Sequence, residues 1–569
     1  MAALIGSANE WVPWPEIESS EVHHWPIVRA YAERIGLRAV VNRVVGEHGR
    51  AFDPGLLVLA MVVDTLSGRS PLYHLESFFE GKDTQVLLGE QVDACVFNDD
   101  NAGAVLNLLY AAGTQKLFSE VSMAALRAFG VSTEQMHFDT TSVSVYGDYR
   151  CNEDDEGRLR ITHGHSKDKR PDLKQFVLSM LCVGGNVPIV GQCEHGNASD
   201  KTLNNTLLST ISKRLKDSGI EEQAFTYIAD SALVTRDNLA AMGQDIRFIT
   251  RLPATYHECE RVIGAAIEAD QWHDIGRLAQ SPPTKNRPGA RYRIWESEVT
   301  LYDTRYRAVV VHSSAHDQRR LKRVQRELTA STNELTRRVK ALHQQNFFCL
   351  ADAEAAAAQA RVERTTYHTL EVRVEQRPQY ARGRPKKDGS RTLKAMHYGL
   401  VVTLVEDVSV TERRRAQAGC FVMLTNVPRY GDGAYDGHKI LASYKEQHSV
   451  ERNFSFLKDD AIVNAIFLKT PQRIEALGLI LVLSLLIWRL IEHQMRQHLT
   501  ATQTTLPGWD NKPTDRPTGY MMTIKFKGIV VLNVGNQRRL ARPLSPSRLA
   551  FLNALGLSPR IFTHSARDG

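Results

Sequence analysis

The sequence predicts a mixed α/β protein that begins with a helical module and carries a β-rich insertion. Three observations support this class. Apolar residues recur at three- to four-residue spacing from about 20 to 130. Strand patterns then dominate, first three in succession and afterwards alternating with helices, which is typical of a sheet with an antiparallel edge. Finally, the region 252–440 interrupts that order. The 569 residues are enough for three or four packed modules.

Helical patterns fill residues 1–132. The segments "PIVRAYAERIGLRAVVNRVV", "PGLLVLAMVVDTLS" and "NAGAVLNLLYAAG" place apolar residues along one side of a helix. The turn "FGVST" follows, and the chain then changes to strands. We therefore expect an all-helical domain that ends near residue 132.

The first part of the predicted sheet occupies residues 133–251. Its strands are expected at 135–147, 175–185, 187–196, 224–230 and 246–253. Its helices are expected at 201–217 and 232–243.

The predicted insertion, 252–440, has a different order of secondary-structure patterns. It contains the alternating strands "RYRIWESEVTLYD" and "RYRAVVVHSS", an Ala-rich helix, the stretch "RPQYARGRPKKDGS" and the strand "GCFVMLTNV". Its basic helix, 319–341, has eight Lys and Arg against two Glu. The chain is expected to return to the first sheet afterwards.

Residues 441–498 are predicted to complete the core with two helices. The second contains "LGLILVLSLLIW" (477–488), a run too short to cross a bilayer, so we expect a buried core helix. Residues 499–569 read as a loop-rich extension with one strand, "YMMTIKFKGIVVLNV".

Charge is distributed unevenly along the chain. The net charge is +7, but the first 100 residues carry 15 acidic against 7 basic side chains, which leaves +15 on the remainder. This asymmetry favours a polyanionic partner for the later modules, with a solvated basic surface as the alternative.

Seven scattered cysteines without a CxxC pair, and no signal peptide pattern, predict reduced thiols in a cytoplasm. Cys193 and His195 are predicted to be structural, since nothing nearby completes a zinc site. The sequence shows no P-loop, Gly-rich dinucleotide turn or nucleophile elbow.

Two aspartates occupy positions that favour a role in metal binding or catalysis. Asp139 lies within the apolar strand "HFDTTS", where an acid is costly unless it is paired or binds a cation. Asp230 ends the strand "TYIAD", at the edge where open α/β sheets build their sites. The structural alternatives are a hydrogen-bonded Asp139 and an Asp230 that caps the next helix.

The stretch "SYKEQHSVERNFSFLKDD" (443–460) adds a polar stripe. On one continuous helix, Tyr444, Gln447, Glu451 and Lys458 fall within an arc of roughly 60°. The alternative is an exposed helix face with a chance Glu–Lys pair.

Three carboxylates brought together resist ionisation unless a cation lies among them, and Mg²⁺ prefers such hard oxygen ligands. Two ions would clamp the attacking and leaving oxygens of a phosphodiester. We therefore predict that Asp139, Asp230 and Glu451 are catalytic residues that hold two Mg²⁺ ions, for which Mn²⁺ can substitute. Lys458 would contact a phosphate, and Tyr444 and Gln447 would contact DNA backbone or bases.

These motifs resemble the DDE transposases of bacterial insertion sequences, in the large group with a Y-x2-R-x3-E-x6-K signature. The chain matches three of the four signature residues, and Gln447 replaces the arginine, which weakens the phosphate contact expected there. The resemblance covers about 135–490, with further matches in "FDTTSVS", "HGNASD", "YIADSALVTRDNL", "HGHSKDKRPDLKQ" and "LTN". It implies a ribonuclease-H-like sheet with a β-rich domain inserted between the second Asp and the Glu.

Two basic loops are candidate DNA contacts. "RGRP" (382–385) is an extended segment suited to the narrow A·T minor groove, and Lys386 and Lys387 follow it. Lys167, Lys169 and Arg170 lie in a loop expected near the acids, where they would contact phosphates. A plain basic loop is the alternative for "RGRP", and His163 and His165 read as ordinary hairpin residues.

The resemblance implies double-stranded DNA as the partner, both at terminal inverted repeats and at the target site. It further implies cut-and-paste movement with a hairpin on the element's end, catalysed by a homodimer on paired ends. We expect a bacterial cytoplasmic protein, nucleoid-associated on DNA, without a membrane partner. Two alternatives are a structure-specific nuclease on the same sheet and a non-catalytic, domesticated DNA-binding protein. The acidic front end would serve dimerisation or end recognition.

Overall fold

The chain folds into two compact units, one formed by residues 1–250 with 443–569 and the other by residues 251–442. We call them unit 1 and unit 2. The computed structural model describes residues 2–4, 11–13, 17–68, 74–149, 158–167, 169–217, 225–243, 245–278, 289–385, 389–459, 468, 470–534 and 537–564.

Residues 1–132 were predicted to be all-helical, which was wrong, because the strands β1 (Ala2–Leu4), β2 (Trp11–Pro13) and β3 (Ile17–Glu21) precede the helices. The group of helices that follows matches the helical patterns of the sequence. The bend between the first two helices is made by Gly36, which has φ 76° and follows the positive-φ preference of glycine. Asp53 caps the third helix by accepting a hydrogen bond from the Leu56 N–H. The helices are α1 Trp25–Ile35, α2 Leu37–Val45, α3 Pro54–Leu66, α4 Leu75–Phe79, α5 Thr84–Leu88, α6 Asp99–Ala112 and α7 Thr114–Phe129.

The sheet of unit 1 is mixed and has the strand order β6-β5-β4-β7-β8. The first three strands along the chain pair antiparallel, whereas β4, β7 and β8 pair parallel. The mixed α/β class with a helical front end is therefore confirmed. The strands and helices of this region are β4 Gln135–Val145, β5 Lys174–Val183, β6 Val187–Glu194, α8 Asp200–Asp217, β7 Thr226–Ile228, α9 Arg236–Met242 and β8 Arg247–Arg251.

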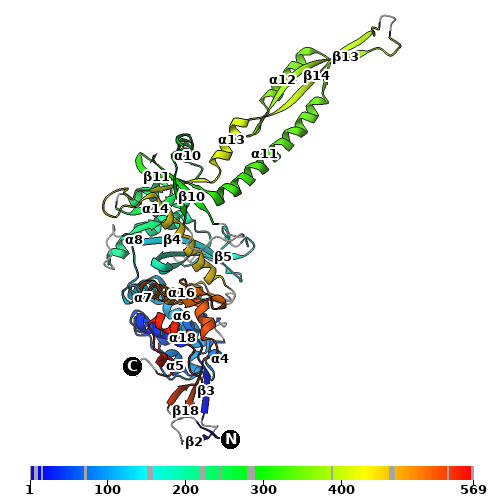
Figure 1. Ribbon diagram of the computed structural model, residues 1–569. Helices are drawn as coiled ribbons and strands as arrows, with labels where there is room; N and C mark the ends of the chain where they lie inside the picture. The colour runs from blue at the N-terminus through cyan, green and yellow to red at the C-terminus, as the bar shows by residue number, and fades with distance from the viewer. Residues whose placement is uncertain are drawn as a thin grey trace. The chain divides into compact units, whose positions relative to one another are not determined.

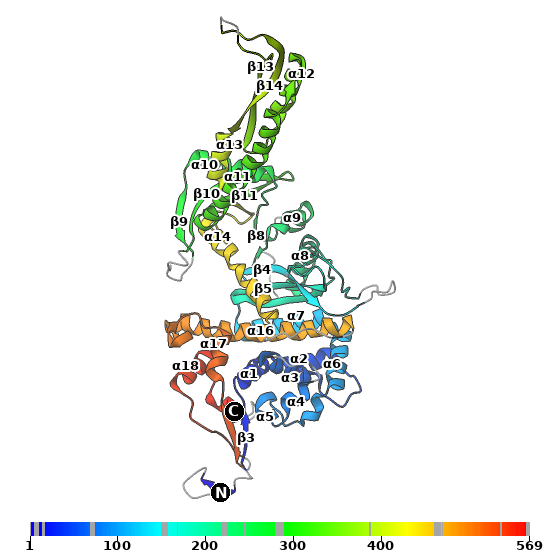
Figure 2. The ribbon, with the colours of Figure 1, turned by 90° about the vertical axis from the view of Figure 1, so that its right-hand side faces the viewer.

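A single long helix, α16 (Pro471–Thr502), forms the centre of unit 1. It contacts β6 on the sheet and α3, α6 and α7 of the front end, and Figure 2 shows it between these two layers. Among the described residues it is the one helix long and apolar enough to cross a membrane, but 94% of its most apolar stretch is buried. The predicted buried core helix is confirmed. The helix is longer than the apolar run 477–488 indicated, because it has 32 residues and is long enough to cross a bilayer.

The C-terminal extension differs from its prediction. Residues 520–534 were expected to form one strand, but α17 (Gly519–Phe526) precedes a shorter strand, β18 (Val530–Val534). Thr518 caps α17 by accepting from the Met521 N–H, and Gly528 at φ 72° separates the two elements. The strand β18 pairs with β3 (Ile17–Glu21), so the two ends of the chain share a small sheet.

The remaining elements of unit 1 are short, apart from one terminal helix. They are β1 Ala2–Leu4, β2 Trp11–Pro13, β16 Leu506–Pro507, β17 Pro513–Thr514, β19 Gln537–Leu540 and α18 Pro546–Leu555.

Unit 2 combines an antiparallel sheet with a second layer in which two helices pack against two long strands. Its basic helix, α11, packs with α12 against the long strands β13 and β14, as Figure 1 shows, and Leu335, Leu342, Ala357, Leu370 and Leu400 form part of their shared core. The elements are α10 His257–Ala269, β9 His273–Arg277, β10 Arg291–Leu301, β11 Thr304–Ser313, α11 Ser314–His343, β12 Asn346–Phe347, α12 Leu350–Val362, β13 His368–Tyr380, β14 Leu393–Glu406, α13 Val408–Gln417 and β15 Cys420–Thr425.

Candidate active site

Asp139 on β4 and Asp230, two residues beyond the end of the neighbouring parallel strand β7, lie at the same level. The last paired residues of these strands are His137 and Ile228, and each aspartate follows its paired residue by two positions. Side chains two residues apart lie on the same face of a strand. Strand register therefore places both acids at the carboxyl end of the parallel pair, where ligand sites of α/β sheets form.

Burial makes the charged form of Asp139 costly. Its side chain is 21% exposed, and burial raises its pKa to about 6, with smaller contributions from the charges of Asp230 and Asp200. Two groups oppose this rise. The Lys167 ammonium lies 3.9 Å from Asp139 Oδ1, and the Thr140 backbone N–H donates to the same oxygen at 2.8 Å. A cation near Asp139 would stabilise its carboxylate further.

Asp230 caps a short helical turn as well as facing the site. Its Oδ1 accepts from the Ala232 N–H at 3.0 Å, and Thr250 Oγ1 donates to its backbone carbonyl at 2.7 Å. Burial is the main cause of its raised pKa, and the negative charge of Asp200 adds to it. The capping interpretation is therefore correct in geometry and remains compatible with a role in the site.

The polar stripe lies on two helices instead of the one that was predicted. The helix α14 (Gly437–Glu446) ends before Gln447, and α15 (His448–Leu457) follows at once. The Gln447 N–H donates to the Tyr444 carbonyl, and the Val450 N–H donates to the Gln447 carbonyl. Both bonds span three residues, so the chain tightens to a 3₁₀-like turn at this point.

One cavity of about 540 Å³ in unit 1 brings the predicted site residues together. Acids from β4, from the end of β7 and from α15 line it, as do the other three residues of the stripe. Its lining residues are Asp139, Thr140, Thr141, Lys167, Asp230, Tyr444, Gln447, Glu451, Phe454, Ser455 and Lys458.

The acids share this cavity without forming a preassembled metal centre. Within the part of the chain that the structure describes, no three His, Cys, Asp or Glu side chains are grouped closely enough to hold a metal ion. The donors themselves suit magnesium, because all three are carboxylates and two of them are destabilised as anions by burial.

A fourth acid, Asp200, lies beside the cavity and was not predicted as a site residue. Asp200, the first residue of α8, accepts from Thr140 Oγ1 at 2.5 Å and lies 3.3 Å from the Lys167 ammonium. Lys167 also donates to Thr140 O and Oγ1, at 2.7 and 2.8 Å. Asp200 ends the quoted motif "HGNASD", and its position at the start of a helix after a strand was the signal that could have identified it.

The other predicted contacts lie elsewhere. Arg170 forms a bidentate pair with Asp172, with bonds of 2.9 and 2.7 Å, and does not line the cavity. Arg382 and Arg384 are exposed directly after β13 in unit 2. Lys386 and Lys387 lie outside the described residues. His195 accepts from the Arg160 N–H at 3.0 Å, which fits the structural role predicted for it.

Comparison with known proteins adds one match. Residues 17–123 match a family profile described as "Domain of unknown function (DUF4277)". No curated protein matches the chain. The matched segment runs from β3 to α7 and therefore covers the helical front end but none of the residues that line the cavity.

Proposed function

We propose that this protein is a DDE transposase of a bacterial insertion sequence, with Asp139, Asp230 and Glu451 as its catalytic acids. One observation carries the proposal. Acids from three distant segments line the same cavity as Lys167 and the polar stripe. The strand order of unit 1, three antiparallel strands followed by two parallel ones, supports a ribonuclease-H-like sheet.

Each residue type has a role in this reaction. Asp139, Asp230 and Glu451 would hold two Mg²⁺ or Mn²⁺ ions, which when bound activate the attacking oxygen and neutralise charge on the phosphate. Lys167 and Lys458 supply cationic contacts to the DNA backbone. Tyr444 and Gln447 orient the strand by hydrogen bonds, or Tyr444 stacks on a displaced base. Attack on the phosphodiester is in line, first by water and then by a 3′-hydroxyl.

The proposal includes the partners and place of action. The substrates are duplex DNA with terminal inverted repeats and a target duplex, and the active form is a homodimer on paired ends. The protein acts in the bacterial cytoplasm, on the nucleoid. Hairpin formation at the element's end belongs to the same proposal.

The direct test combines purified full-length protein with Mg²⁺ and duplexes that carry the inverted repeats bracketing its gene. We expect cleavage at the repeat ends and joining of pre-cut ends to a target plasmid. Cleavage without joining would identify a structure-specific nuclease instead. Binding without cleavage, in either Mg²⁺ or Mn²⁺, would identify a non-catalytic DNA-binding protein.

The exposed "RGRP" segment gives a separate prediction for DNA binding. Affinity for DNA falls as salt rises, and each phosphate contact contributes roughly 0.9 to the steepness of log affinity against log salt. Replacing Arg382 and Arg384 with alanine is therefore expected to make this dependence less steep by about 1–2. It should also remove any preference for A·T-rich flanks, because arginine favours their narrow minor groove. Fluorescence anisotropy across a salt series measures both effects.

The matched control is Arg50→Ala, which removes an exposed arginine from the acidic front end. Binding by this variant should equal that of the unaltered protein. Unchanged salt dependence in the Arg382→Ala/Arg384→Ala variant would remove these residues from the DNA interface.

A further inference from the structure

The helix that carries Glu451 depends on its surroundings for its position. The helix α15 has ten residues, and an isolated helix of this length is not stable in water. Its side chains Val450, Phe454, Phe456 and Leu457 are buried, whereas Glu451 is exposed toward the cavity. Contacts on the buried side therefore decide where the Glu451 carboxylate lies.

Asn453, two residues after Glu451, is fully buried and fixed on both sides of its amide. Its Nδ2 donates to Cys182 Sγ at 3.1 Å and to the Asn186 carbonyl at 3.0 Å, which ties α15 to the end of β5 and the turn after it. Its Oδ1 accepts from Arg489 Nε at 2.6 Å. The amide thus links the sheet to α16 through α15.

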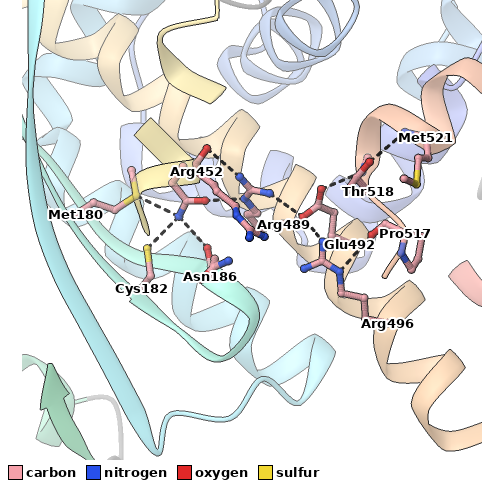
Figure 3. Close-up of polar contacts among 12 residues, drawn as sticks. Met180, Cys182, Asn186, Arg452, Arg489, Glu492, Arg496, Pro517, Thr518 and Met521 are labelled. Carbon is pink, nitrogen blue, oxygen red and sulfur yellow. Dashed lines mark hydrogen bonds and ion pairs between the residues drawn. The ribbon is translucent and has the colours of Figure 1, made fainter. Parts of the chain in front are cut away.

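Arg489 extends this link into a buried ionic network. Its side chain is 8% exposed, and Nη2 donates to the Arg452 carbonyl on α15 at 3.2 Å while Nη1 pairs with Glu492 at 2.7 Å. Glu492, 3% exposed, also accepts from Arg496 at 3.1 Å. Figure 3 shows the three charged side chains in a row along α16. All three Arg489 nitrogens are used, and two of them bind α15.

The C-terminal extension completes the network. The Gly519 N–H donates to Glu492 Oε1 at 2.9 Å, and the Pro517 carbonyl accepts from Arg496 at 3.2 Å. A Cβ at Gly519 would lie 2.2 Å from Trp488, so only glycine permits this approach. Tyr520 then donates to Asp459 at 2.8 Å, one residue beyond the stripe residue Lys458.

We propose that Arg489 and Glu492 are positioning residues that couple the segment 517–520 of the C-terminal extension to α15 and thereby set the position of Glu451. The proposal rests on the proposed function for the role of Glu451 as a metal ligand. In this proposal the C-terminal extension helps to fix the position of a catalytic acid, although none of its described residues lines the cavity.

Arg489→Lys tests the network because it keeps the charge that pairs with Glu492 but loses the planar fork that binds three groups at once. In the protein without metal, we expect backbone amides of 448–457 to exchange with deuterium at least fivefold faster, while amides of 474–487 exchange as before. The Mg²⁺ concentration for half-maximal cleavage should rise five- to tenfold, with most of the rate restored at saturating Mg²⁺. Tyr520→Phe should shift both readouts in the same direction by a smaller factor.

Two further variants guard against a general loss of stability. The triple variant Arg489→Met/Glu492→Leu/Arg496→Met replaces the whole buried ionic network with apolar groups, a change that is often neutral for stability, and should still show the raised Mg²⁺ requirement. Arg538→Met removes an ion pair with Asp83 elsewhere in unit 1 and should change neither readout.

The outcomes separate the two proposals. If the unaltered protein does not cleave its ends, the proposed function fails. If it cleaves, and Arg489→Lys leaves α15 exchange or the Mg²⁺ requirement unchanged, the positioning role is wrong. The same holds if Arg538→Met reproduces both shifts.

Discussion

Replacing Asp139 with asparagine is expected to reduce DNA cleavage by at least a thousandfold while making the metal-free protein more stable. Cleavage is lost because an amide is a poor magnesium ligand and one of three acids disappears. Stability rises because burial opposes the carboxylate charge and raises its pKa to about 6 from an ordinary value of 3.8. The gain at neutral pH is about 3 kcal/mol, at 1.36 kcal/mol for each pKa unit.

The stability gain should depend on pH in a defined direction. Well below pH 3.8 the acid is neutral in both folded and unfolded chains, so the two proteins should unfold alike. As pH rises toward 6, the unfolded chain ionises first, and the unaltered protein loses stability relative to Asp139→Asn. Above pH 6 to 7 the difference should stay constant. Urea unfolding at a series of pH values measures this window, and Mg²⁺ should narrow the gap by binding only the unaltered protein.

The matched control is Asp303→Asn, the same chemical change at an exposed turn with φ 65°, a conformation that asparagine tolerates well. This variant should cleave DNA normally and unfold like the unaltered protein. If Asp139→Asn cleaves as well as the unaltered protein, Asp139 is not a catalytic acid. If its stability is lower above pH 6, the burial argument for the pKa is wrong.

Deleting residues 1–130 is expected to prevent unit 1 from folding. The helices α1, α3, α6 and α7 contact α16, whose side chains from Ala476 to Ile491 are buried. Each large apolar side chain returned to water costs about 1.5–3 kcal/mol. A handful of them exceeds a typical total stability of about 5–15 kcal/mol. We expect the truncated chain to aggregate, or to lose near-ultraviolet circular dichroism and cooperative melting.

Deleting residues 1–16 is the control, because among the described residues the strands β1 and β2 pair with each other alone, and they precede the segment that packs on α16. This shorter deletion should leave a soluble, cooperatively melting protein. A monodisperse fragment 131–569 with a sharp thermal transition would show that the front end is a separable module. In that case its predicted role in dimerisation or end recognition could be tested by deletion.

Much of the fold was predictable because local patterns agreed with tertiary packing. The strand β4 was expected at 135–147 and observed at Gln135–Val145, and α8 and β5 agree equally well. Their hydrophobic periods are long and uninterrupted, which leaves few alternatives. The sequence also placed Asp230 at the carboxyl end of its strand, whereas Asp139 was predicted within a strand, and it is the parallel pairing of β4 with β7 that brings the two acids to the same level.

Other features could not be predicted, for identifiable physical reasons. The tightened turn at Gln447 involves no glycine or proline, and its backbone remains right-handed helical with φ −56° and ψ −30°. The segment 519–526 is mostly apolar, and its pattern is compatible with a helix or a strand. The Thr518 cap favours the helix that the structure shows. Asp200 reaches Thr140 and Lys167 by tertiary contact only.

The sheet shared by β3 and β18 has a consequence for biosynthesis. The strand β3 leaves the ribosome early, but its partner β18 and the central helix α16 follow only after the whole of unit 2. At about 5–20 residues per second, roughly 10–40 seconds separate the synthesis of residue 250 from that of residue 471. During that time the nascent chain exposes the apolar surfaces of the front-end helices and of β6, because α16 has not yet been synthesised to cover them. We expect the chain to need protection by chaperones. A stop codon anywhere before residue 530 would yield a product without a completed unit 1.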